Sequence, residues 1–402
     1  MKWLYLILLT LLTFCSQPQK EKPEETSTSP TFMVSPARGN ASLPHLIKGN
    51  DNKLYISWVE QGDSNLTSFY YATLEGDEWT EPQLIASGND WFVNWADYPM
   101  IAVDNMGNMS AHYLAKSSSG TYSYDVNVVL KSTGDSTWSD PIIPHTDGTP
   151  TEHGFVTMLP QNDGTFLLAW LDGRKTGAGD HGHTSGAMTL RSAVLDMEGN
   201  LSEEGELDEH VCDCCQTGGQ IISDTPMIVY RDRSEDEIRD MAFVTKTEGT
   251  WSTPKVVAHD NWNIAGCPVN GPRIASYKKT AVVAWYTSAL GRPTVKVAFL
   301  NPDNFLESTI IDDTNPMGRV DVVMINEDSA FVSWLDGGDK PAIKYRMVNR
   351  NGSMSSERAV SETSEARGSG FPQMELVNNT LYFAWTEVGE ESTVRLAIQE
   401  IK

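Results

Sequence analysis

The chain has 402 residues, of which 40% are hydrophobic and 21% are charged, so it can bury a large core and is long enough for more than one domain. It carries 54 acidic against 30 basic side chains, a formal net charge of −24. This excess of negative charge repels phosphate backbones, so nucleic acid is excluded as an expected partner. A small anionic ligand is not excluded, because local arginines can reverse the potential inside one pocket.

The first 15 residues predict a signal peptide, because an apolar run from Trp3 to Phe14 follows a lysine and ends at Cys15. A cysteine at this place resembles the bacterial lipobox. The resemblance implies lipidation at Cys15 and a membrane-anchored lipoprotein of the cell envelope, on its periplasmic face or at the cell surface. An ordinary cleaved signal is the alternative, and the run is too short to span a bilayer. Residues 16–28 have the composition of a disordered tether, so we expect the folded domain over residues 29–402.

Seven copies of one strand pattern organise the rest of the chain. Each copy has small or apolar residues that lead to an aromatic residue, often followed by an acid. The copies are Ile56-Ser57-Trp58, Ala111-His112-Tyr113, Leu168-Ala169-Trp170, Ile228-Val229-Tyr230, Val283-Ala284-Trp285, Val332-Ser333-Trp334 and Phe383-Ala384-Trp385. Another strand precedes each copy by about ten residues, and a third strand follows it. The repeat predicts a single all-β propeller of four-stranded blades, with seven blades favoured and six as the alternative.

Only six linkers with an outer strand lie between the seven copies, for example at Gly76–Pro82. The seventh outer strand is expected from Ser29–Val34, so that the N-terminal strand completes the last blade and closes the ring. The tryptophans of the repeat are expected to pack between blades rather than to bind a ligand. These residues are Trp58, Trp170, Trp285, Trp334 and Trp385.

Chemistry is expected where the loops entering the innermost strands gather at one mouth of the central channel. Arg38, Arg319 and Arg367 precede the innermost strands of the first, sixth and seventh units, which are neighbours in a closed ring. Three guanidinium groups at one mouth can bind a carboxylate, and Arg174 in a nearby loop is a fourth candidate for substrate binding. Alternatively, each arginine pairs with a local acid, such as Asp321, or caps a turn.

The segment Ser132–Trp138 is similar to the Asp box of the bacterial sialidase superfamily, with its Asp and Gly displaced. Arg38 ahead of Leu43-Pro44 resembles the first arginine of that family. The resemblance implies a sialidase-like exo-glycosidase, or a degenerate relative, that binds an acidic, carboxylate-bearing sugar at the propeller mouth. Seven units depart from the six blades of that family, which leaves open whether the chain is an enzyme.

The family uses an Asp as acid/base and a Tyr, activated by a Glu, as nucleophile. By their place in the entering loops of the second and third units, we assign Asp97 as the candidate acid/base. Tyr98 and Glu152 are the candidate nucleophile pair. The expected partner is therefore a carbohydrate or another small acidic ligand, and the membrane is contacted only through the lipid anchor.

Four cysteines besides Cys15 occupy two entering loops of neighbouring units and can meet at the mouth: Cys212, Cys214, Cys215 and Cys267. In an oxidising compartment an even number predicts two disulfides. The alternative is a thiolate site for zinc or copper, with His153, His181 or His183 as further candidate ligands. Close spacing argues against three clustered sulfurs binding one ion in ideal geometry. With such a site the chain would be a non-catalytic propeller that binds a metal or a partner.

Overall fold

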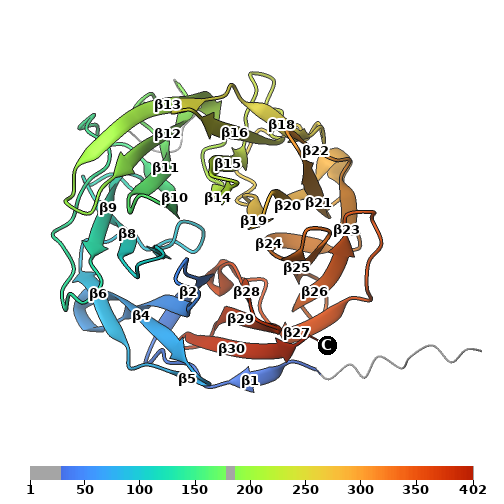
Figure 1. Cartoon of the computed structure of the whole chain (residues 1–402), viewed down its shortest axis with the longest axis horizontal. Helices are drawn as coiled ribbons and strands as arrows, with labels where there is room; N and C mark the ends of the chain where they lie inside the picture. The colour runs from blue at the N-terminus through green and yellow to red at the C-terminus, as the bar shows by residue number, and fades with distance from the viewer. Residues whose placement is uncertain (1–28, 178–185, 402) are drawn as a thin grey trace, which may run out of the picture.

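The computed structural model describes residues 29–177 and 186–401, which form 30 β-strands and three short 3-10 helices. The short helices are η1 (Asp63–Asn65), η2 (Ala289–Gly291) and η3 (Arg367–Ser369). The strands form seven antiparallel sheets arranged radially around one axis (Figure 1). The prediction of a seven-bladed, all-β propeller is thus confirmed. Cys15, His181 and His183 lie outside the described residues.

The first three blades contain twelve strands. The first blade consists of β2 (Ala41–Lys48), β3 (Leu54–Gln61), β4 (Thr67–Glu75), β5 (Glu78–Trp79) and β6 (Gln83–Gly88). The second consists of β7 (Met100–Val103), β8 (Met109–Lys116) and β9 (Tyr124–Lys131). The third consists of β10 (His153–Pro160), β11 (Phe166–Asp172), β12 (Met188–Leu195) and β13 (Leu201–Val211). In the second blade an isolated bridge between Val128 and Ile142 takes the place of an outer strand.

The other four blades contain the remaining strands. The fourth consists of β14 (Gly218–Ile222), β15 (Thr225–Arg231), β16 (Met241–Thr247), β17 (Thr250–Trp251) and β18 (Lys255–Ala258). The fifth consists of β19 (Arg273–Tyr277), β20 (Thr280–Thr287), β21 (Thr294–Asn301), β22 (Asn304–Phe305) and β23 (Thr309–Asp312). The sixth consists of β24 (Pro316–Asn326), β25 (Ser329–Asp336), β26 (Ala342–Asn349) and β27 (Arg358–Glu362). The seventh consists of β28 (Gln373–Val377), β29 (Thr380–Glu387), β30 (Thr393–Glu400) and β1 (Thr31–Met33).

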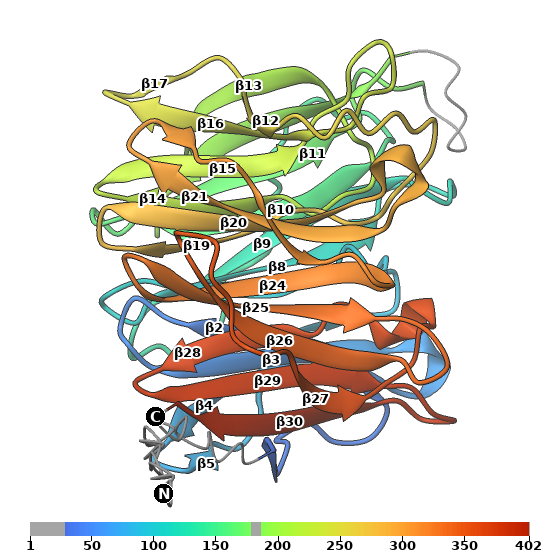
Figure 2. The same cartoon turned by 90° about the vertical axis from the view of Figure 1, so that its right-hand side faces the viewer.

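The two ends of the folded region share the seventh blade. Strand β1 lies beside β30 and pairs with it antiparallel (Figure 1). In this pairing Phe32 lies opposite Ala397. The ring of Phe32 also contacts Trp385, at 6.0 Å between centroids. Since β1 covers the outer edge of β30, the seam leaves less unpaired strand edge at the chain ends. Figure 2 shows the ring from its side, with the strands of each blade running between its two faces.

The repeated tryptophans pack between blades, as predicted, and all five are at most 2% exposed. Trp170 of the third blade lies among residues of the second blade, and Trp285 of the fifth lies among residues of the fourth. The acid that often follows the aromatic residue has a related role. The indole N–H of Trp170 donates to Asp172 at 2.8 Å, so a buried polar group is satisfied within the packing.

The innermost strands of three blades contain a β-bulge at equivalent positions. Leu43, Phe155 and Arg319 have φ values of 56°, 54° and 50°, and the strand register shifts beside each. A bulge leaves a main-chain N–H without its ladder partner. In each case a side chain supplied from a neighbouring blade accepts it: Thr386 for Leu43, Asp97 for Phe155 and Asn270 for Arg319.

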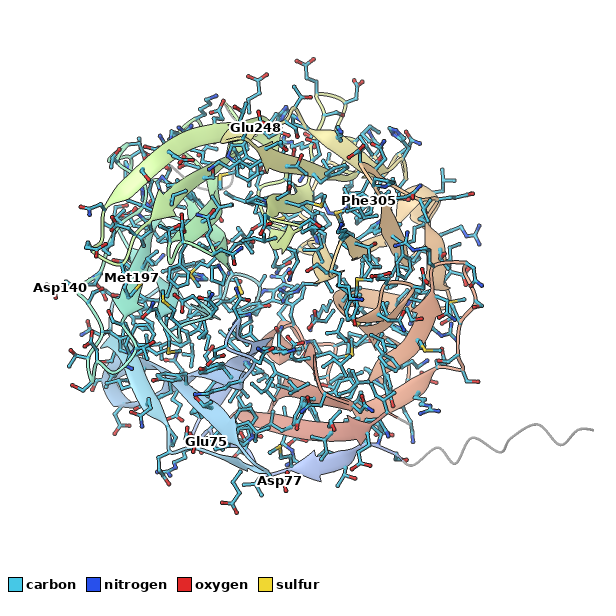
Figure 3. The ribbon with its side chains drawn as sticks, viewed as in Figure 1. Glu75, Asp77, Asp140, Met197, Glu248 and Phe305 are labelled. Atoms are coloured by element: carbon cyan, nitrogen blue, oxygen red, sulfur yellow. The ribbon has the colours of Figure 1, made fainter. Side chains whose placement is uncertain are left out.

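The loop before β7 reaches across to residues of other blades at one end of the channel. Its Trp95 stacks on Phe371, with centroids 5.7 Å apart, and its Ala96 carbonyl accepts a hydrogen bond from Gln216. Innermost strands line a cavity of about 890 Å³ along the axis. Acidic side chains such as Glu75, Asp77, Asp140 and Glu248 lie on the outer rim (Figure 3). Among residues 29–177 and 186–401 there is no helix of the length and hydropathy needed to cross a membrane.

Candidate functional site

Two carboxyl groups and one tyrosine hydroxyl, from the second and third blades, meet at this end of the channel. Asp97 lies in the loop before β7, Tyr124 begins β9, and Glu152 directly precedes β10. The Tyr124 hydroxyl donates a hydrogen bond to Glu152 Oε1 at 2.5 Å and lies 3.4 Å from Asp97 Oδ2. A parallel bridge between Tyr124 and Glu152 fixes the main chain beneath this contact. One hydroxyl therefore lies between two carboxyl groups.

The three groups are buried, with exposed fractions of 2% for Asp97, 1% for Tyr124 and 9% for Glu152. Burial raises the pKa of Asp97 to about 7, although hydrogen bonds from Phe155 and Tyr124 act to lower it. Burial also raises the pKa of Glu152 to about 8, and the charge of Asp97 adds to this. Near neutral pH the two carboxyl groups therefore hold about one proton between them, as an acid–base pair requires.

Asp97 also has a structural task, because its Oδ1 accepts the Phe155 N–H of the bulge at 2.8 Å. That task does not require an acid. Asn270 accepts the corresponding Arg319 N–H through a neutral amide, at 2.7 Å. The approach of Asp97 does require glycine at position 154, since a Cβ there would lie 2.0 Å from Asp97 Oδ2. The bulge thus needs only a hydrogen-bond acceptor at position 97, and the ionisable carboxyl group is not required for it.

Tyr98 is not the partner of Glu152, so this part of the sequence prediction was wrong. The Tyr98 hydroxyl accepts hydrogen bonds from Arg273 and, at 3.1 Å, from Gln373 at the axis. The tyrosine that binds Glu152 is Tyr124, which the sequence analysis missed. A topological signal was available, because the first and third strands of an antiparallel blade run in the same direction and both begin at the mouth.

The expected arginine triad is not formed. Arg38 is exposed and pairs with Glu81 at 2.6 Å. Arg319 is buried and donates to Ser369 and to main-chain carbonyls of residues 365, 366 and 370. Arg367 is exposed near Arg319, and burial together with the Arg367 charge lowers the pKa of Arg319 to about 10. Arg174 pairs with Asp172 at 2.8 Å. Arg38, Arg174 and Arg319 thus each engage different partners.

The β-bulge at Arg319 explains why the predicted arginine triad does not form. Arg319 has positive φ and corresponds in the fold to Leu43 rather than to Arg38. The bulge turns the Arg319 side chain beneath the segment that holds η3, where its guanidinium also faces the ring of Trp95 at 4.9 Å. Arg38 and Arg319 precede innermost strands in the same way in the sequence, yet their side chains point to different partners.

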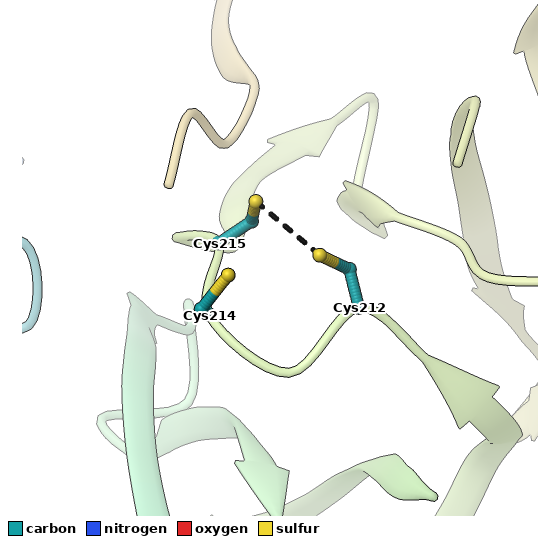
Figure 4. A group of neighbouring side chains, drawn as sticks. All are labelled: Cys212, Cys214 and Cys215. Carbon is teal, nitrogen blue, oxygen red and sulfur yellow. Dashed lines mark hydrogen bonds between the residues drawn. The ribbon is translucent and has the colours of Figure 1, made fainter. Parts of the chain in front are cut away.

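A cluster of thiols lies at the same mouth, between the fourth and fifth blades. The Sγ atoms of Cys212, Cys214 and Cys215 all lie within 4.8 Å of one another, and Cys212 and Cys215 are 3.5 Å apart (Figure 4). Cys267 comes from the neighbouring entering loop and its thiol interacts with that of Cys214, but it is not among the three sulfurs within 4.8 Å of one another. All four are free thiols rather than disulfides. The turn that contains Cys212, Cys214 and Cys215 thus brings their sulfurs within 4.8 Å of one another.

Arginines surround the thiol cluster. Arg239 is fully buried and donates to Cys212 Sγ at 3.2 Å and to Glu237 at 2.8 Å. Arg233 contacts Asp213 and Glu237. Although burial acts to raise it, the pKa of Cys212 is held well below its usual range by hydrogen bonds from the other thiols and by the charges of Arg239 and Arg231. The charges of Asp213 and Cys267 also act on Glu152, so the cluster and the Tyr124 site share one mouth.

His153 belongs to a different group and not to the thiol cluster. Its ring stacks on His145, with centroids 3.7 Å apart and planes 6° from parallel. Asp147 lies 3.3 Å from His153 Nε2, and Asp125 lies 3.5 Å from its Nδ1. Parallel stacked rings cannot both direct their in-plane lone pairs at one ion, and Arg174 lies 3.5 Å from Asp147. The geometry therefore favours a protonated His153 between Asp125 and Asp147 over a bound metal ion.

Neither a protein-family model nor a curated protein matches the sequence. Solved structures with the same fold do match. A Dyadobacter fermentans protein of unknown function aligns over 93% of this chain and 98% of its own, with 12% identity and a TM-score of 0.53. The polysaccharide lyase Uly1 aligns over 96% and 94%, with 9% identity and a TM-score of 0.52. A Fusarium graminearum α-L-arabinofuranosidase aligns over 93% and 98%, with 12% identity and a TM-score of 0.50.

Sialidases are also among the matched structures, at TM-scores of 0.49 and below. At such identities the likeness concerns the fold, which this chain shares with propellers that act on carbohydrates. Substrate and activity must be argued from the site itself.

Proposed function

We propose that this propeller is a carbohydrate-active enzyme, a glycoside hydrolase whose reaction takes place at Tyr124, Glu152 and Asp97. The observation that carries the proposal is the Tyr124 hydroxyl held between two carboxyl groups, 2.5 Å from one and 3.4 Å from the other. Burial raises the pKa values of the two acids to about 7 and about 8, and the bulge contact of Asp97 needs only a hydrogen-bond acceptor. Such pairs are typical of acid–base catalysis.

The roles follow from the distances. Glu152 is the closer acceptor of the Tyr124 proton, so it acts as the base that makes the phenolic oxygen a nucleophile. The reactive form has Glu152 ionised and Asp97 protonated; it is the less populated one-proton form, because the pKa of Glu152, about 8, lies above that of Asp97, about 7. In this form Asp97 donates a proton to the departing glycosidic oxygen. Attack then forms a bond from the tyrosine oxygen to the anomeric carbon, and water activated by Asp97 later breaks that bond.

The tyrosine nucleophile predicts the stereochemistry. Attack by the Tyr124 oxygen and later hydrolysis of the bond that it forms each invert the anomeric carbon, so the two displacements together retain its configuration. The site therefore supports a double displacement with retention of configuration.

The sugar class is the finer part of the proposal. An acidic sugar was expected on the strength of three arginines, but Arg38 and Arg319 are engaged in contacts elsewhere. We therefore propose only that the substrate is a glycoside, and the substrate panel must include neutral sugars and arabinofuranosides beside sialosides and uronides.

The test is turnover of aryl glycosides by the purified chain and by Tyr124→Phe, Glu152→Gln and Asp97→Asn. We expect each variant to lower kcat/KM about 10²–10⁴-fold on the substrate that the wild type turns over. Asp97→Asn should lose less on an aryl glycoside with a good leaving group, because that step needs no acid. NMR of the released sugar should show retained configuration.

Tyr98→Phe is the matched control, since it removes one hydroxyl from the same mouth. It should lower stability through loss of the Arg273 and Gln373 contacts while leaving kcat/KM unchanged. Full activity of Tyr124→Phe, or inversion of configuration, would remove the assigned mechanism. Absence of turnover across the whole panel would remove the hydrolase proposal.

We further propose that the protein is a lipoprotein of the cell envelope, anchored at Cys15. The support is the sequence alone, an apolar run that ends at this cysteine. Labelling cells with radioactive palmitate should mark the wild-type chain and not Cys15→Ala. Equal labelling of both, or labelling of neither, would contradict lipidation at this residue.

A further inference from the structure

We propose that Cys212, Cys214, Cys215 and Cys267 together bind one thiophilic d¹⁰ metal ion, Zn²⁺ or Cu⁺, at the propeller mouth. The proposal is independent of the hydrolase proposal, because it rests on a different set of side chains. Soft thiolate ligands select these ions over the hard cations that carboxylates prefer.

The first support is the spacing of the sulfur atoms. A tetrahedral site with Zn–S bonds of about 2.3 Å places its sulfurs about 3.8 Å apart. Cys212 and Cys215 are 3.5 Å apart, and Cys214 lies within 4.8 Å of both. A turn after β13 turns all three side chains toward one point (Figure 4). Bringing these three sulfurs to about 3.8 Å from one another requires shifts of up to about 1 Å.

The second support is the fourth ligand, which comes from another blade. Cys267 lies in the loop between β18 and β19, and its thiol interacts with that of Cys214. It is not among the three sulfurs that lie within 4.8 Å of one another, so it must move closer to bind the same ion. Cys212, Cys214 and Cys215 are at most 8% exposed, whereas Cys267 is exposed. Cys267 therefore completes the site on its solvent side, where an ion can enter.

The third support is the charge around the cluster. The guanidinium of Arg231 is 2% exposed, and within the described residues all its hydrogen bonds go to main-chain carbonyls, those of Arg239, Asn270 and Tyr286. Its charge acts on both Cys212 and Cys215. A buried cation needs compensating negative charge nearby. Four thiolates around Zn²⁺ or Cu⁺ carry a net negative charge, which supplies it.

Arg239 adds to the same argument. Its N–H donates to Cys212 Sγ at 3.2 Å, the kind of contact that stabilises a metal-bound thiolate from outside. Two disulfides would be neutral and would leave Arg231 facing uncharged sulfur, whereas Arg239 would keep its pair with Glu237. They would also require each bonded pair of sulfurs to approach to about 2.05 Å.

The experiment measures metal and thiols on the full-length chain, purified without chelator. Elemental analysis should find one zinc or copper ion per chain, and which of the two is found identifies the natural occupant. Alkylation after denaturation with chelator should find all four thiols. Titration of the metal-free protein with Co²⁺ should give thiolate-to-metal charge-transfer absorption. The double variant Cys212→Ser/Cys215→Ser should lose both the ion and this absorption.

Because that variant alters a buried region, its fold is checked by circular dichroism, and an exposed substitution serves as a second test. Cys267→Ser should retain the fold and lower the affinity for Zn²⁺, measured by competition with a chelator, at least about tenfold. Ala265→Ser in the same exposed loop is the matched control and should leave the affinity unchanged. Two disulfides in freshly purified protein, or four thiols that bind neither Zn²⁺ nor Cu⁺, would overturn the proposal.

Discussion

Replacing Asp97 with asparagine should remove a pH-dependent part of the free energy of unfolding. The carboxyl group is 2% exposed, and its burial raises the pKa from 3.8 to about 7. The folded state therefore favours the protonated form. The stability contributed by this group is fully present below the unfolded pKa, near 4, and is lost as the pH rises through about 7.

The magnitude follows from the shift. At about 1.36 kcal/mol per pKa unit, the shift from 3.8 to about 7 corresponds to about 4 kcal/mol. This value is an upper one, because Glu152 faces the same hydroxyl and takes part of the proton. The asparagine variant keeps an acceptor for the Phe155 N–H, as Asn270 does for Arg319, so the bulge can persist.

Urea unfolding followed by tryptophan fluorescence, at a series of pH values from about 4.5 to 8.5, measures the difference. The wild-type free energy of unfolding should fall with pH more steeply than that of Asp97→Asn, by up to about 3 kcal/mol over this range, because part of the loss already occurs below pH 4.5. A constant offset from the substitution cancels in this comparison. Parallel curves for the two proteins would refute the reasoning, because they would mean that Asp97 ionises in the folded protein as it does in the unfolded chain.

Three further outcomes are expected. Trp170→Ala should lower the free energy of unfolding by about 3–5 kcal/mol in urea, because it empties the contact between the second and third blades. Arg319→Ala should lower it by more than about 1 kcal/mol, whereas Arg38→Ala should change it by less than about 0.5 kcal/mol, since its pair with Glu81 is exposed. In NMR titrations the pKa of the His153 ring should lie above 6.5, because Asp125, Asp147 and Asp172 raise it although burial opposes them. The pKa of His145 should be about 4, because burial and the charge of His153 lower it. The reverse order of the two pKa values would contradict the stacked geometry.

The sequence by itself determined the ring. Strand pattern, repeat count and packing of the tryptophans are properties of a local unit copied seven times, so they can be recognised without knowing where each blade lies. The structure also places Phe32 opposite Ala397, in the blade for which the sequence lacked an outer strand.

Only the tertiary structure decided which side chains meet at the mouth. Asp97 and Tyr98 are consecutive, yet Asp97 faces Tyr124 while Tyr98 faces Arg273. The chain bends at Asp97, and the two side chains contact residues of different blades, Tyr124 in the second and Arg273 in the fifth. In the same way the bulge at Arg319 redirects an arginine that the repeat alone would align with Arg38. Such directions depend on main-chain angles at single residues and on contacts across blades, neither of which a repeat pattern contains.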